Sequence, residues 1–191
     1  RKVLSEMSLY KASVTYSEES INAFAKAQFG IFQRKTKITL LAAATLLLLL
    51  GAFEVGGQAI SILLLFAGCL LIVNVGNIPR RTAKAMMKSS ATFDIADYDF
   101  GDRAFTVTSG GASSRVEYKN VIHLGEDSRY YYIFCSPRVG YMLAKQSLAP
   151  NEPGGFRQLL ASGSNCKWSG TGSALSTNLP MLIARLKNRQ K

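Results

Sequence analysis

Two long uncharged, apolar runs separated by a short polar break dominate the hydrophobic pattern of this chain. The first run covers residues 38–53 and the second 59–78, with Glu54 and a glycine pair marking a turn between them. A bilayer core of roughly 30 Å is crossed by about 20 apolar helical residues, and shorter spans are tolerated when flanking residues reach the interface. The pattern predicts a transmembrane helical hairpin over 36–79. The alternative is a pair of core helices in a soluble protein, but a chain of this length seldom buries two consecutive helices on all faces.

Basic residues flank this hairpin on both sides, whereas its central turn holds one acid and no base. Cytoplasmic flanks of membrane helices carry an excess of Lys and Arg, so we expect both termini on the cytoplasmic face of the membrane. Basic residues beside a span also attract anionic lipid. We therefore predict a membrane-surface binding set consisting of Arg34, Lys35, Lys37, Arg80, Arg81, Lys84 and Lys88.

The N-terminal segment, 1–35, is patterned as a short strand followed by an amphipathic helix. Apolar residues over 9–16 suggest the strand, and the spacing of Thr15 and Glu18 fits a capping box at the start of the helix. Gly30 is a candidate kink. Two placements of the helix stay open, either on the membrane surface or against the soluble domain. Its apolar stripe consists of Ile21, Phe24, Ala25, Phe29 and Phe32.

The chain beyond the hairpin changes from a helical period to a period of two. Pro79 is expected to begin a short basic helix that extends through Lys88, and strands bounded by turn residues follow. A Pro/Gly-rich break at 150–155 precedes an apolar helical face at 156–161. These features predict a domain over 80–166, in which an antiparallel sheet or partial barrel is covered by one helix. The expected strands centre on 93–95, 105–107, 116–118, 121–124, 130–135 and 141–143.

One of these strands, 130–134, is apolar on both faces. Such a strand is either central in its sheet or meets a partner with one face, and we favour the central position. On the other interpretation, Tyr130 and Tyr132 are the candidate contacts with a protein partner.

The last segment, 167–191, departs from the sheet pattern. Residues 168–178 are rich in Ser, Gly and Thr, which is typical of a flexible linker, and 180–191 has the pattern of a short basic amphipathic helix. The tail either binds a membrane surface or a partner, or ends as a solvated or domain-packed segment.

The order of these elements resembles the YcxB-like family of bacterial membrane proteins. The resemblance covers roughly 9–161 and implies an α+β membrane protein in which the hairpin carries a cytoplasmic domain of pleckstrin-homology-like (PH-like) fold with no established catalytic role. The stretches that carry the resemblance are 92–94, 105–109, 116–121, 130–134, 141–145 and 156–160.

Composition and motifs contain little that points to catalysis. The formal net charge of +11 suits nucleic acid as well as membranes, but outside the juxtamembrane clusters the bases are dispersed among acids. His123 is the sole histidine and lies in a strand pattern, and the three cysteines have no metal-ligand spacing. Acids around Asp99 do not fit a calcium loop. We expect no enzyme, no cofactor, no metal and no nucleic-acid partner.

Two functions from different classes remain. The first is a membrane-anchored module that binds or scaffolds a protein partner, or anionic lipid, at the cytoplasmic face. The second is an accessory subunit of a larger bacterial assembly for export, transport or immunity, in which small residues such as Gly51 and Gly68, with Asn74, contact other helices. Packing within the hairpin is the competing interpretation of those small residues, and a homo-oligomer is also compatible with the sequence.

Overall fold

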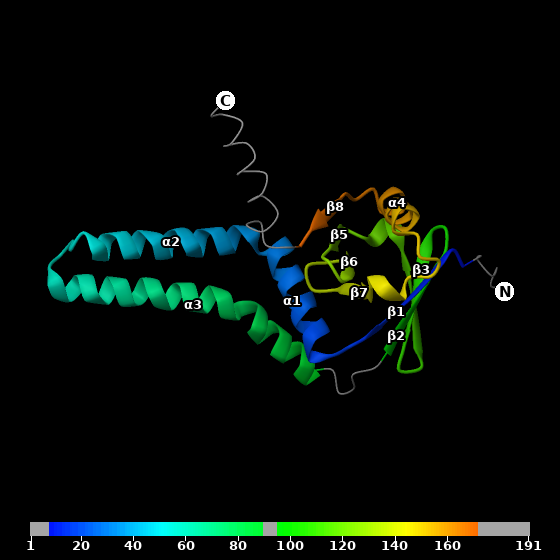
Figure 1. Ribbon diagram of the computed structural model, residues 1–191, viewed down its shortest axis with the longest axis horizontal. Helices are drawn as coiled ribbons and strands as arrows, with labels where there is room; N and C mark the ends of the chain where they lie inside the picture. The colour runs from blue at the N-terminus through cyan, green and yellow to red at the C-terminus, as the bar shows by residue number, and fades with distance from the viewer. Residues whose placement is uncertain (1–7, 90–94, 172–191) are drawn as a thin grey trace, which may run out of the picture. The chain divides into compact units, whose positions relative to one another are not determined.

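The computed structural model describes residues 8–89 and 95–171, which divide into a sheet domain and a helical unit. The sheet domain comprises the described residues of Arg1–Tyr16 and Phe93–Lys191, and the helical unit those of Ser17–Thr92. The helical unit is thus inserted between the first and second strands of the sheet domain (Figure 1). The fold class is α+β with two long apolar helices and antiparallel sheets, as the sequence predicts.

The first sheet is an antiparallel meander in the order β1-β2-β3-β4. Alternation in β2 buries Ala96, Tyr98 and Phe100 on one face, as period-two sequences do. Gly110 and Gly111, with φ of 56° and 79°, form the two-residue turn between β3 and β4 that the glycine pair predicts. The strands are β1 (Tyr10–Thr15), β2 (Ile95–Phe100), β3 (Ala104–Ser109) and β4 (Ala112–Glu117).

The second sheet has the order β7-β6-β5-β8, in which β8 is parallel to β5 and the other pairs are antiparallel. β6 lies inside the sheet and is buried from Tyr131 to Phe134, which confirms the predicted central position. The prediction of a flexible linker over 168–178 is wrong at its first residues, because Trp168–Gly170 is a strand. The predicted tail helix lies outside the described residues. The strands are β5 (His123–Glu126), β6 (Tyr130–Phe134), β7 (Gly140–Ala144) and β8 (Trp168–Gly170).

Helix α4 (Pro153–Ser164) closes the core of the sheet domain through Phe156. The Phe156 ring lies 5.5 Å from Tyr10 and 5.0 Å from Phe100, both in the first sheet, and 5.2 Å from Tyr131 in the second. Pro153 suits the first turn of the helix, where its missing N–H costs nothing. One fully buried aromatic ring therefore joins both sheets to the helix, as the predicted apolar face at 156–161 requires.

The helical unit begins with α1 (Glu18–Phe32), whose cap differs from the predicted one. Ser17 is the N-cap, and its hydroxyl and that of Ser20 exchange hydrogen bonds with each other's backbone N–H. The predicted Thr15 cap is wrong because Thr15 still pairs in β1. The helix also continues past Gly30 and breaks at Gln33, the residue before α2 (Arg34–Ala52).

Helices α2 and α3 (Gln58–Ser89) form an antiparallel hairpin whose closest approaches use glycine. A Cβ on Gly51 would lie 2.8 Å from Leu65 Cγ, and one on Gly68 would lie 2.8 Å from Leu48 Cγ. The small residues of the two spans thus pack within the hairpin itself.

The expectation that Pro79 begins a new helix is wrong. α3 continues through Pro79 to Ser89, and Figure 1 shows it bending in its C-terminal part. Proline inside a helix removes one backbone hydrogen bond and typically kinks the axis rather than ending the helix when packing supports both sides.

The contact between α4 and the 3₁₀ turn η1 (Tyr118–Asn120) generates a stability prediction. A Cβ on Gly163 would lie 2.6 Å from Tyr118 Cδ2, and the buried Tyr118 ring is held by its hydroxyl, which donates to Gly101 O at 2.7 Å. We expect Gly163→Ala to lower the free energy of unfolding by roughly 1–3 kcal/mol through overpacking. Thermal unfolding of the full chain in detergent measures this.

Gly154→Ala is the matched control, because Gly154 lies in the same helix and a Cβ there meets no atom within 4 Å. Alanine has a higher helix propensity than glycine, so we expect the free energy of unfolding of Gly154→Ala to be unchanged or to rise by up to about 1 kcal/mol. Equal losses in the two variants would contradict the packing argument.

Candidate functional site

The antiparallel hairpin brings the two predicted groups of basic residues to one end of the helical unit. Three of them are in the first turn of α2 and four in the C-terminal part of α3 (Figure 1). All are exposed, and none forms an ion pair with an acid among residues 8–89 and 95–171. We name this set the basic collar: Arg34, Lys35, Lys37, Arg80, Arg81, Lys84 and Lys88.

One collar residue has a defined orientation. Arg81 Nη2 donates to Asn74 Oδ1 at 3.4 Å, seven residues toward the N-terminus of α3. The Asn74 side chain in turn donates from Nδ2 to Leu70 O at 3.0 Å, so its carbonyl oxygen is left to accept from Arg81. Asn74 therefore makes its two described hydrogen bonds within α3 rather than across helices.

The two tyrosines predicted to contact a partner differ in exposure. Tyr130 is half-buried, and the Arg129 guanidinium lies 5.6 Å from the centre of its ring. Tyr132 is fully buried, so its prediction as a surface contact is wrong. Tyr132 lies in β6, which has a neighbouring strand on each side, and its hydroxyl donates to Asp127 Oδ2 at 2.5 Å in the turn between β5 and β6. Burial and this carboxylate both raise the pKa of Tyr132 above its usual range.

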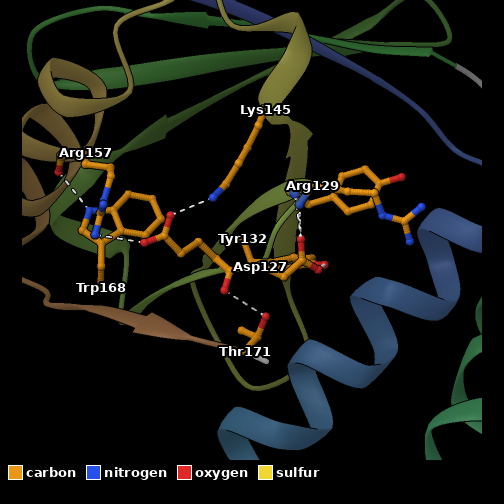
Figure 2. Close-up of polar contacts among 9 residues, drawn as sticks. Asp127, Arg129, Tyr132, Lys145, Arg157, Trp168 and Thr171 are labelled. Carbon is orange, nitrogen blue, oxygen red and sulfur yellow. Dashed lines mark hydrogen bonds and ion pairs between the residues drawn. The ribbon is translucent and has the colours of Figure 1, made fainter. Parts of the chain in front are cut away.

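Asp127 organises that turn as an Asx turn. Its Oδ1 accepts from the backbone N–H groups of Arg129 and Tyr130, at 2.7 and 2.8 Å. A carboxylate that accepts several hydrogen bonds in a short loop fixes the loop conformation. The Asp127 carboxylate therefore fixes the backbone that carries Arg129 and Tyr130. Figure 2 shows Asp127 in this turn, close to Arg129 and Tyr132.

Sequence analysis missed a network of charged residues centred on Glu126, the last residue of β5. The Glu126 carboxylate accepts from Lys145 Nζ at one oxygen and from Arg157 Nη2 at the other, both at 2.9 Å. Figure 2 shows the Lys145 side chain, which directly follows β7, and the Arg157 side chain of α4 joined by dashed lines to the same carboxylate. The network therefore joins β5, the end of β7 and α4. Both carboxylate oxygens of Glu126 are occupied by ion pairs, so neither oxygen is free for proton transfer.

The same network holds β8 in place. Trp168 Nε1 donates to Arg157 O at 2.9 Å, and the Trp168 ring meets Tyr131 edge-on at 5.3 Å. Thr171 donates to Glu126 O through both its backbone N–H and its hydroxyl, at 2.8 and 3.1 Å. The local pattern of small polar residues around 168–171 carries no signal for these contacts.

A shallow open groove lies beside α4 and β1, with a volume of about 410 Å³. Leu9, Tyr10, Pro150 and Leu159 supply its apolar walls, and Glu152, Gln158 and Ser162 its polar rim. Gly155 keeps the groove open toward Tyr10, because a Cβ there would collide with the Tyr10 hydroxyl.

The remaining candidate residues for chemistry lie apart. His123 is in β5, as predicted, and Asp97, Asp99 and Asp102 are exposed on β2 and its turn. Cys135 is half-buried, and burial raises the pKa of its thiol. Among the residues that the structure describes, no group of three or more His, Cys, Asp or Glu is placed to hold a metal ion.

The His123 contact with β8 generates a pH prediction. The Ser169 hydroxyl donates to Leu124 O at 3.1 Å, so His123 Nε2 is the donor in the 2.8 Å contact with Ser169 Oγ. Burial lowers the pKa of His123, so the unfolded chain takes up the proton first as pH falls. We expect the free energy of unfolding to fall between pH 7.5 and pH 5.5.

His123→Gln removes the titrating group and retains an N–H donor. Unfolding of both proteins across this pH range isolates the histidine contribution as the difference between them. The free energy of unfolding of the wild type minus that of the variant should fall as pH falls from 7.5 to 5.5. A difference that is flat, or that grows as pH falls, contradicts the predicted sign.

Comparison with known proteins identifies a family for the central part of the sheet domain. The family model described as YcxB-like protein matches residues 100–160, from the end of β2 into α4. No curated protein matches the chain, and no solved structure matches it. The matched segment contains the β5–β6 turn, the Glu126 network except Trp168 and Thr171, and most of the groove. Over residues 100–160 the chain is thus similar to the YcxB-like family, which confirms the predicted resemblance for this part of the chain.

Proposed function

We propose that this chain is a non-enzymatic, membrane-anchored module of PH-like fold that binds or scaffolds a protein partner, or anionic lipid, at the cytoplasmic face of a bacterial membrane. The observation that carries the proposal is the insertion of two apolar helices into the first strand pair of a compact sheet domain. The helices supply the anchor and the sheet domain the binding surface.

The exposed surface of the hairpin supports the membrane anchor. Arg34–Ala52 and Gln58–Lys88 are long and apolar enough to cross a bilayer, and only 11% and 17% of their most apolar windows are buried. Core helices of soluble proteins are mostly buried, whereas these expose large side chains such as Phe53, Leu63 and Phe66 at 78%, 67% and 64%. A continuous apolar surface of this extent needs a covering, and lipid is the covering that suits a helical hairpin.

The connections between the two units support a role in placement. Thr15 of β1 pairs with Ile95 of β2, and these residues end and begin the strands on either side of the insertion. Two residues join β1 to α1, and five separate α3 from β2. Both connections therefore start from the same end of the β1–β2 pair. A hairpin that spans a membrane would hold the sheet domain at that end.

The layout of the sheet domain supports the PH-like assignment. Four antiparallel strands are followed by three more in a second sheet and then by a helix whose Phe156 is buried between them. β8 is an addition to that layout. Domains of this type bind partners with exposed edges and grooves, and the groove beside α4 and the rigid Tyr130 turn are the surfaces that suit a protein partner here.

The accessory-subunit alternative receives no separate support from the hairpin. Gly51 and Gly68 are used in contacts between α2 and α3, and Asn74 bonds within α3. A subunit of a larger assembly would need other residues to contact its neighbours.

Topology is the first test of the proposal. In a cysteine-free background, we expect an impermeant maleimide to label Glu54→Cys, in the turn between the spans, from outside intact cells. Asp102→Cys, exposed on the sheet domain, should be labelled only after lysis. Labelling of Asp102→Cys in intact cells would contradict a cytoplasmic sheet domain. The native Cys135 is a poor reporter because burial raises the pKa of its thiol.

Mass measurement after purification in mild detergent tests the module against the subunit. A monomer or homo-oligomer is expected for a module whose partner binds reversibly. Recovery of a fixed hetero-complex that survives dilution would favour the accessory subunit instead. Leu159→Arg, which places a charge in the groove, is expected to lower binding of any protein partner at least tenfold, with the exposed Gln146→Arg as the matched control outside the groove.

A further inference from the structure

We propose that the outer edge of β4 is an interface with a second copy of this chain, paired antiparallel across a two-fold axis at Val116. In this pairing Arg115 of each copy lies opposite Glu117 of the other copy. The inference goes beyond the proposed function, because it assigns a partner to a surface that neither the anchor nor the groove includes. It rests on the proposed function in one respect, since anchoring in a membrane brings the copies together.

β4 is the last strand of the first sheet, and β3 is the one strand that pairs with it among the described residues. Its burial pattern leaves every residue exposed except Val116. The other edge of this sheet is occupied, since Lys11 of β1 exchanges backbone hydrogen bonds with Ala149, both at 2.7 Å. An exposed strand edge is a template for a further strand, and β4 has neither a proline nor a break in register to prevent this.

The register of β3 and β4 determines which backbone groups face the outer edge. The two-residue turn between these strands places Ala112 in the first hydrogen-bonded pair, and just beyond β4 Tyr118 N donates to Arg103 O. Bonded and non-bonded pairs alternate in an antiparallel ladder, so the even-numbered residues of β4 bond to β3. The backbone N–H and C=O groups that point to the outer edge are therefore those of Ser113, Arg115 and Glu117.

The order of charges along β4 favours one position of the two-fold axis. Directly opposite residues of an antiparallel pair are either both bonded or both non-bonded, so odd-numbered residues must lie opposite one another. An axis at Arg115 places two guanidinium groups together, and an axis at Glu117 places two carboxylates together. Axes nearer the turn place neither charge opposite the other. Only an axis at Val116 places each arginine opposite a glutamate.

The side chains of Arg115 and Glu117 lie on the same, outer face of the sheet. Alternate residues of a strand share a face, and Val116 between them is buried on the core side. Opposite residues of a bonded pair have Cα atoms about 5.5 Å apart, so opposite charges there stabilise the pairing and like charges destabilise it. Lys119 contacts Glu117 at Oε2, and the carboxylate has a second oxygen that suits an arginine of the other copy.

The predicted interface is short, because η1 begins directly after Glu117. Each bonded pair exchanges two backbone hydrogen bonds, so the two pairs of Arg115 with Glu117 supply about four. Such an interface is weak in dilute solution, but confinement of both copies to one membrane raises their effective concentration. We therefore expect a reversible dimer whose population rises with protein density in the membrane.

The test uses the full chain in lipid vesicles and measures energy transfer between dyes over a series of protein-to-lipid ratios. The dyes are attached to Gln146→Cys in a cysteine-free background, because Gln146 is exposed and lies outside β4. We expect transfer above the level of random encounters for the chain with its natural β4. Arg115→Glu or Glu117→Arg, present alone, should raise the dimer dissociation constant about fivefold or more, because like charges then lie opposite each other.

Mixing the two variants distinguishes the proposed pairing from a general effect on folding. One copy then carries two acids at the outer edge and the other carries two bases, so a mixed dimer regains both ion pairs. We expect the mixture to recover the transfer of the natural sequence. Arg138→Glu and Glu152→Arg make the same charge changes at exposed positions outside β4. These controls should leave the dissociation constant unchanged, alone or mixed.

The inference is overturned if the natural sequence shows only random transfer at every ratio. It is also overturned if the single variants keep the natural constant, if their mixture does not recover transfer, or if the control variants behave in the same way. Cross-linking tests the register, since Arg115→Cys mixed with Glu117→Cys should form a disulfide between copies. Arg115→Cys alone should form little, because its two Cα atoms would be roughly 8 Å apart. Equal cross-linking in both cases contradicts an axis at Val116.

The inference and the proposed function can fail separately. Labelling of Glu54→Cys from outside intact cells tests the anchor and involves neither β4 nor a second copy. If the hairpin does not cross the membrane, the proposed function fails, and the mixing experiment is then made in detergent micelles, where recovery on mixing is still expected. A hairpin that crosses, with no recovery on mixing, defeats the inference alone.

Discussion

The pairing of β1 with β2 is the constraint on which the rest of this structure depends. The two strands are far apart in sequence and flank the whole helical unit, yet they align over six residue pairs from Tyr10 with Phe100 to Thr15 with Ile95. Without this pairing, Tyr10 would lose its contact with Phe156, and the first sheet would lose an edge strand. The helical unit would then be attached to the folded sheet domain at one point instead of two.

Two kinds of interaction complete the sheet domain around that pairing. Phe156 joins both sheets and α4 through aromatic contacts that exclude water. Glu126, at 19% side-chain exposure, joins β5 to Lys145 and Arg157, and Arg157 O receives the Trp168 indole N–H. The apolar contacts supply the larger share of stability. The polar contacts are partly shielded from solvent, so breaking an ion pair of Glu126 would leave an unpaired charge at a cost in free energy. These contacts therefore favour one position for β8.

The proposed function assigns different tasks to the two units. The helical unit carries the apolar spans and a basic collar that forms no ion pair with an acid among the described residues, features that suit lipid. The sheet domain carries a groove and a rigid turn, features that suit a protein partner. Hairpin glycines that face the opposite helix allow α2 and α3 to pack closely together. Anchoring and binding thus rest on separate residues, so each is open to mutation independently of the other.

Much of the fold follows from the sequence because periodicity reports local geometry. The apolar runs at 38–53 and 59–78, the alternation around Phe105 and Val107, the Gly110–Gly111 turn and the apolar face of α4 each specify an element without reference to the remainder of the chain. The basic collar is equally visible, since it consists of residues next to the spans. What the sequence determines by itself is the set of elements and their order.

Only the tertiary structure decides which distant segments meet. The local sequence around β1 does not indicate that β2 is its neighbour. The local sequence around Trp168 does not predict a strand that pairs in parallel with β5. Glu126 meets Lys145 and Arg157, which are distant in sequence, and Tyr132 is buried in β6, between β5 and β7. Pro79 lies inside α3 rather than at a helix start, although proline by itself is typical of the first helical turn. Such choices depend on shape and charge complementarity between surfaces that form only after collapse, and no window of local sequence contains that information.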